Sequence, residues 1–68
     1  MKHFLKIKDY HWASGSTKKM IYIDDKGDSF LGRPYNVTVG ETIFVEISNR
    51  PLEDGHYHII KLVRRMKR

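Results

Sequence analysis

Apolar and polar residues alternate through much of this chain, and residues 42–48 show the pattern most clearly. One face of this segment is entirely aliphatic and is made by Ile43, Val45 and Ile47. The other face carries Thr42, Phe44 and Glu46. A period of two is the period of a β-strand with one buried face. The same period at 3–8, and a run of β-forming residues at 18–24, predict an all-β chain.

Turn-forming residues separate the predicted strands at short intervals. Asp24-Asp25-Lys26-Gly27-Asp28 predicts a tight turn between strands at 18–24 and 29–31, with Gly27 in the left-handed conformation. Gly32-Arg33-Pro34 ends the second of these strands, because proline cannot donate a hydrogen bond to a sheet. Residues 9–17 predict a loop whose start can continue the first strand, and 35–39 alternates only weakly.

We expect these segments to form a single small five-stranded barrel that spans residues 1–68, OB-like or SH3-like in topology. A barrel has no exposed sheet edges, which a sheet of this size could not otherwise protect. The last predicted strand, 56–64, is apolar on both faces at its middle, so we expect it to be central. A short helical turn within 60–68 is the only helix the pattern allows. A homodimer also remains open, because a chain this short has a thin core.

The run Val39-Gly40-Glu41-Thr42-Ile43-Phe44-Val45-Glu46-Ile47 resembles a pattern of small barrels, in which glycine and an acid open a strand of alternating aliphatic residues. Across 35–64 the layout is similar to OB-fold proteins of the cold-shock and bacterial initiation-factor type, and also to SH3-like barrels. The resemblance implies a nucleic-acid-binding barrel. It transfers no binding residues, because the aromatic-rich motifs of cold-shock domains have no counterpart here. The nearest segment is Phe30-Leu31-Gly32.

Positive charge gathers at the two ends of the chain, whose formal net charge is +5. All eight acidic residues lie within 9–55, and residues 61–68 contain no acid. This distribution is typical of a surface that binds polyanions. We therefore predict a nucleic-acid-binding protein whose basic residues hold phosphates. The candidates are Lys2, Lys6, Lys8, Lys18, Lys19, Lys61, Arg64, Arg65, Lys67 and Arg68.

Aromatic residues interleave with these cations. Tyr10 and Trp12 lie between Lys8 and the Lys18-Lys19 pair, and we predict that they stack on bases. The alternative for Trp12 is a structural role in the core or at its rim. Phe4 alternates with lysines, but we expect Phe4 and Phe44 to pack in the core or in a second layer.

Other chemistries find little support in the sequence. The chain has no cysteine, which excludes disulfides and thiolate ligands. His56 and His58 share a strand face and could bind a metal with His3, His11 or Asp54, but this spacing is common by chance. Ser48, His58 and Asp54 can be written as a triad, yet nothing sets them apart. We expect no catalytic residue, no metal and no cofactor.

A protein-interaction module is the alternative function. A small regulator of the phage or plasmid type would dock its basic end on an acidic surface of a host protein. A ribosome-associated or assembly protein is a third interpretation. The first residues lack the apolar run of a signal peptide, and no segment approaches the roughly 20 apolar residues of a membrane span. We therefore expect a cytoplasmic protein without a membrane partner.

Overall fold

A computed structural model describes residues 1–15 and 18–66, and these form six strands and no helix. The strands are β1 (Lys2–Lys6), β2 (Asp9–Trp12), β3 (Met20–Ile23), β4 (Ser29–Gly32), β5 (Thr42–Ile47) and β6 (Tyr57–Met66). They form one sheet in the order β1-β5-β6-β4-β3-β2. All neighbours are antiparallel except β4 and β6, which are parallel. The prediction of an all-β fold is confirmed.

The sheet differs from the predicted five-stranded barrel in strand number and in closure. The N-terminal segment contributes two strands, because β1 pairs with β5 and the chain then passes through Ile7 and Lys8 into β2, which pairs with β3. β1 and β2 are the two edges of the sheet and do not pair with each other, so the sheet is not closed. A sequence pattern of period two reports which face of a strand is buried and not which strand it pairs with.

One local expectation also changes. Residues 60–66 belong to β6, where we expected a helical turn within 60–68, and the weakly alternating segment 35–39 is not a strand. The β-branched residues that lead this segment suit a paired strand better than a helix. Residues 67–68 lie outside the described part of the chain.

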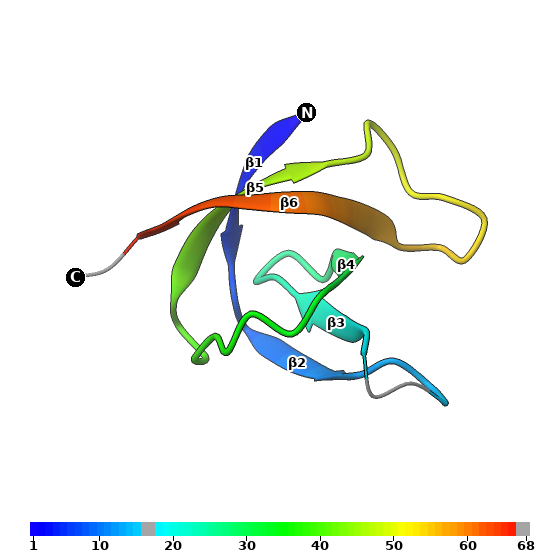
Figure 1. Ribbon diagram of the computed structural model, residues 1–68, viewed down its shortest axis with the longest axis horizontal. Helices are drawn as coiled ribbons and strands as arrows, with labels where there is room; N and C mark the ends of the chain where they lie inside the picture. Colours follow the sequence, from blue (N-terminus) through cyan, green and yellow to red (C-terminus); the bar gives the residue numbers. More distant parts are fainter. Residues whose placement is uncertain (16–17, 67–68) are drawn as a thin grey trace.

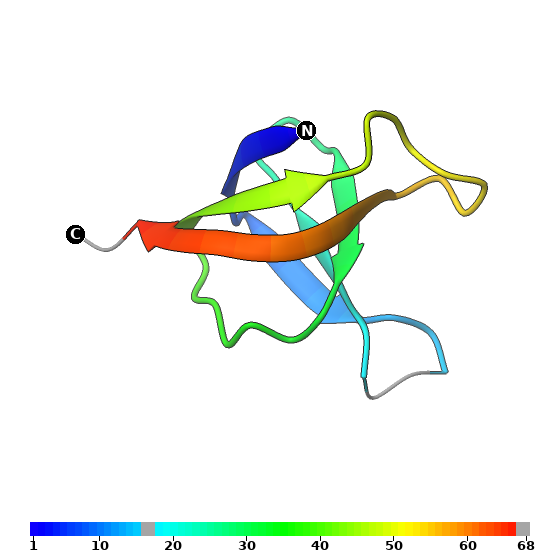
Figure 2. The same ribbon diagram turned by 45° about the horizontal axis from the view of Figure 1, so that its top comes forward.

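β1, β5 and β6 lie on one side of the molecule, and β2 and β3 lie on the other (Figures 1 and 2). The apolar side chains between them form the core. Its buried members are Leu5, Ile7, Met20, Tyr22, Phe30, Val37, Ile43, Val45 and Ile47. The aliphatic face predicted at 42–48 therefore lies in the core, and the sheet curves around it.

The predicted turn after β3 is confirmed. Gly27 has a φ of 88°, and the carboxylate of Asp24 accepts hydrogen bonds from the backbone N–H groups of Lys26 and Asp28 at 3.0 and 2.9 Å. These bonds satisfy a carboxylate that is only 3% exposed. The next strand, β4, ends at Gly32 as expected.

β6 is central, as predicted, and it contains two irregularities. Its pairing with β5 shifts register between Phe44 and Val45 and again between Glu46 and Ile47. Such bulges increase the local twist of a strand. At its N-terminal end β6 passes close to β4, since a Cβ added at Gly32 would lie 3.0 Å from side-chain atoms of Ile59. Glycine permits this close approach.

Candidate nucleic-acid interface

The outward side of β1, β5 and β6 gathers residues from both ends of the chain. In β1, Lys2, Phe4 and Lys6 are exposed, whereas Leu5 is fully buried. In β5 the alternate positions are buried, so Phe44 points to the same outward side as Phe4. On β6, Lys61 and Arg64 are exposed. We call this surface the β1–β5–β6 face, and its members are Lys2, Phe4, Lys6, Phe44, Lys61 and Arg64.

The strand register arranges these residues in rows across the sheet. Phe4 lies opposite Phe44, which lies opposite Arg64. In the neighbouring row Lys2 and Lys61 lie on either side of Glu46. The face therefore has one carboxylate and four cations, and its net charge is positive.

The two phenylalanines form a pair at the centre of the face. Their ring centroids are 4.4 Å apart with the rings tilted by 32°, and Phe4 is 56% exposed. Neither ring belongs to the buried core, so of the two packing roles expected for these residues only packing in a second layer, ring against ring, fits the structure. The alternation in the sequence already indicated that both rings point outward, since Phe4 shares its face with lysines and Phe44 shares its face with polar residues.

Arg65 has a different position from Arg64. It lies opposite Ile43, and its guanidinium donates to the Glu41 carboxylate from Nε at 2.8 Å and from Nη2 at 2.9 Å. It also donates to the carbonyl oxygens of Tyr35 and Asn36, each at 3.0 Å. The hydrogen bond to Glu41 raises the pKa of Arg65. The guanidinium thus ties β6 to the β4–β5 connection and has little donor capacity left for a phosphate.

The remaining predicted residues lie on and beside the β2–β3 hairpin. Tyr10 is 37% exposed with its ring 6.4 Å from that of Tyr22, and Trp12 is 50% exposed. The lysines of this group are also exposed, and they are Lys8, Lys18 and Lys19. Lys67 and Arg68 lie outside the described residues. The structure therefore separates the predicted residues into the β1–β5–β6 face and a hairpin group.

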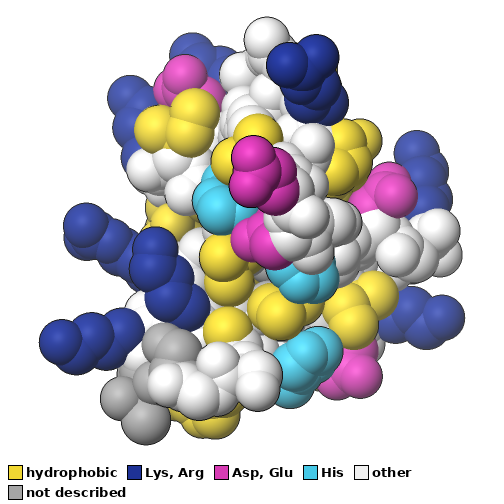
Figure 3. Space-filling view, turned by 90° about the vertical axis from the view of Figure 1, so that its right-hand side faces the viewer, with side chains coloured by type: hydrophobic (Ala, Val, Ile, Leu, Met, Phe, Trp, Pro, Cys, Tyr) yellow, Lys and Arg dark blue, Asp and Glu magenta, His cyan; other side chains and the backbone are white. Residues whose placement is uncertain are grey.

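A third side of the molecule carries mixed charge. In Figure 3, hydrophobic side chains, histidines and acidic side chains occupy the middle of the view, and lysine and arginine side chains project around the margin. Register places His11, Ile21, Leu31 and His58 in one row across β2, β3, β4 and β6. The centre of this side is not basic, so it is a poorer surface for phosphates.

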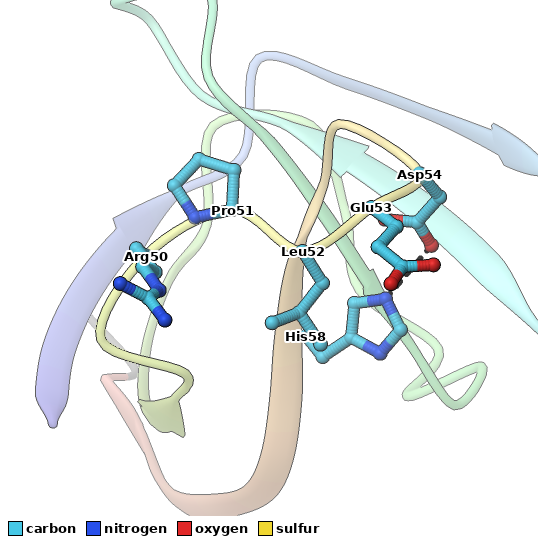
Figure 4. A pocket seen from close by; sticks show the side chains of 6 residues that line it. All are labelled: Arg50, Pro51, Leu52, Glu53, Asp54 and His58. Carbon is cyan, nitrogen blue, oxygen red and sulfur yellow. Dashed lines mark hydrogen bonds and ion pairs between the residues drawn. The ribbon is translucent and has the colours of Figure 1, made fainter.

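The β5–β6 loop borders an open hollow of about 780 Å³ (Figure 4). Its lining residues are Arg50, Pro51, Leu52, Glu53, Asp54 and His58. Asp54 accepts hydrogen bonds from the backbone N–H of His56 at 3.0 Å and from Nε2 of His58 at 2.8 Å. These bonds, the backbone one first, lower the pKa of Asp54. They hold the loop against the start of β6.

The loop does not assemble a nucleophile. The Ser48 hydroxyl accepts the backbone N–H of His58 at 3.1 Å and donates to the carbonyl of Arg50 at 2.9 Å, so it does not meet an imidazole nitrogen. A hydroxyl–histidine contact also joins Ser29 and Nδ1 of His56 at 2.6 Å, and among the described residues no side-chain hydrogen bond joins that ring to a carboxylate. Within 1–15 and 18–66, no three metal-ligating side chains gather in one place.

Comparison with known proteins finds no matching family model, no matching curated protein and no matching solved structure. Among the residues that the structure describes, no helix is long and apolar enough to cross a membrane.

Proposed function

We propose that this protein binds nucleic acid without catalysis, through phosphate contacts on the β1–β5–β6 face. The observation that supports this is the arrangement of four exposed cations around the Phe4–Phe44 pair, of which Phe4 is exposed. Lys and Arg side chains hold phosphates and release counterions from the nucleic acid, which favours binding at low salt. The candidate residues fall into the β1–β5–β6 face and the hairpin group. The cations of the β1–β5–β6 face lie on paired strands, so the register of the sheet defines their spacing.

The fold that carries this face is, we propose, a partly open barrel of the OB-like kind, with β1 and β2 acting as one bent strand. Backbone hydrogen bonds support this view. Ile7 donates to Glu41 at 2.9 Å and accepts from Gly40 at 2.7 Å, and the next residue, Lys8, donates to Ile23 at 2.8 Å. Pairing thus passes from the β5 side to the β3 side without a gap. Counted in this way, the sheet has five strands, as OB-folds do.

Charge reversal on β6 tests the proposal. We expect Lys61→Glu with Arg64→Glu to weaken binding to labelled oligonucleotides by about tenfold or more, measured by fluorescence anisotropy at low salt. The matched control is Lys26→Glu with Arg50→Glu, which makes the same change in net charge on loops outside the face. Circular dichroism of each variant checks that the fold is retained.

The control variant decides between a specific surface and a general charge effect. Equal weakening in both variants would mean that net charge alone attracts the nucleic acid. If the wild-type protein binds neither DNA nor RNA at low salt, the proposal is wrong, and a search for an acidic protein partner takes its place.

A further inference from the structure

We infer that the β1–β5–β6 face selects single strands, with unpaired bases stacking on the Phe4–Phe44 pair. This inference rests on the proposed function and goes further, because phosphate contacts alone do not distinguish single strands from duplexes. The structural basis is an aromatic pair whose Phe4 is exposed, with Lys2 and Lys6 on either side of Phe4 along β1 and Arg64 in the same row on β6.

The dimensions of the face suit a short stretch of single-stranded nucleic acid. Lys2 and Lys6 lie on either side of Phe4 and are about 13 Å apart along β1, given the rise of a β-strand. Arg64 lies two strands away from Phe4, or about 10 Å across the sheet. A nucleic-acid backbone whose phosphates contact these cations would therefore run past the phenylalanine pair, and its bases could turn toward the rings.

A duplex cannot use the aromatic part of this face. Its base faces are covered by neighbouring base pairs, and its grooves admit a helix or a projecting two-stranded ribbon. The β1–β5–β6 face is the outward side of three neighbouring strands of the sheet, so a duplex would meet only the lysines and Arg64. A single strand gains the same phosphate contacts and also the stacking of its bases on Phe4, which is 56% exposed.

Trp12 is the competing platform, and its surroundings differ from those of Phe4. Trp12 lies on the edge strand β2, opposite the buried Met20, and no aromatic ring pairs with it among the contacts of the described residues. Phe4 instead has Phe44 beside it, Lys2 and Lys6 at the flanking outward positions of β1, and Arg64 in the same row on β6. The Phe4–Phe44 pair is therefore the aromatic surface that shares a row with a cation of a paired strand, Arg64.

The test compares one sequence as single-stranded and as duplex DNA. We expect Phe4→Leu, which keeps an apolar side chain without a π-face, to weaken single-strand binding by about fivefold or more and to leave duplex binding unchanged. A second variant carries Phe4→Trp with Trp12→Phe, which moves the only tryptophan to the face. It should retain single-strand preference, and its fluorescence should be quenched by single strands.

Each outcome separates this inference from the proposed function. Salt-dependent binding with equal affinity for both DNA forms, unchanged by Phe4→Leu, would overturn the inference and leave the proposed function standing. Selective loss of single-strand binding in Trp12→Leu but not in Phe4→Leu would also overturn it, because the platform would then lie on β2. Absence of binding to both forms at low salt would remove the proposed function itself.

Discussion

Removal of two cations from β6 should halve the salt dependence of binding, and the structure supplies the number. Four cations surround the phenylalanine pair on the β1–β5–β6 face: Lys2, Lys6, Lys61 and Arg64. Each phosphate contact contributes about −0.7 to the slope of log affinity against log salt for a single strand, so four contacts give about −2.8. The variant Lys61→Ala with Arg64→Ala should therefore show a slope of about −1.4.

These slopes convert into affinities that are easily measured. Between 50 and 200 mM salt, the wild-type affinity should fall about 50-fold, whereas that of the variant should fall about sevenfold. Fluorescence anisotropy titrations of a labelled single strand at three salt concentrations give both slopes. Substitution by alanine leaves the strand pairing of β6 intact, and thermal unfolding of the variant verifies this.

The slope should respond to the position of the lost charges and not only to their number. Lys26→Ala with Arg50→Ala removes the same two charges from loops outside the face and should leave the slope within error of the wild type. The prediction is wrong if this control flattens the slope as much as the β6 variant does. It fails equally if Lys18→Ala with Lys19→Ala reduces the slope and the β6 variant does not, because the phosphates would then lie along the β2–β3 hairpin.

Three further predictions concern stability. The buried hydroxyl of Tyr22 bonds a carbonyl and an N–H of the β4–β5 connection, so Tyr22→Phe should lower the free energy of unfolding in urea by about 1–3 kcal/mol. Gly32→Ala places a methyl group 3.0 Å from Ile59 and should lower the Tm, since overpacking costs about 1–3 kcal/mol; an unchanged Tm would argue against this close approach. The pKa of Asp54 is lowered, chiefly by the backbone N–H of His56. Its contribution to stability is therefore present above its ordinary pKa of 3.8 and is lost as pH falls through the lower folded value, which an NMR titration of this carboxyl can follow.

Local features of the fold could be predicted because their causes lie within a few residues. The buried face of β5 follows from the alternation at 42–48, and the turn at 24–28 follows from aspartates and a glycine that favour it. The end of β4 at Gly32 follows from the proline two residues later. In each case the residues that determine the conformation are neighbours in the chain.

Features that depend on distant parts of the chain were beyond sequence reasoning. The role of Arg65 is an example, because its partners are Glu41 and two carbonyl groups that only the folded sheet brings to β6. The passage of the N-terminal segment from β5 to β3 is another. Phe4 and Phe44 form an intermediate case, because alternation indicates an outward position for both, but their contact requires the register of β1 with β5.

The position of β6 has a consequence for how the chain folds. β6 is the last strand in chain order, yet it lies in the middle of the sheet, between β5 and β4. The bent N-terminal segment joins the pair β1–β5 to the group β2–β3–β4 at Ile7 and Lys8, and β6 completes the sheet by pairing with both β5 and β4. We therefore expect slow, all-or-none folding with no stable half-folded form, because most strand pairing waits for contacts between distant residues. Stopped-flow refolding should accordingly show a single exponential phase on a timescale of roughly milliseconds to seconds.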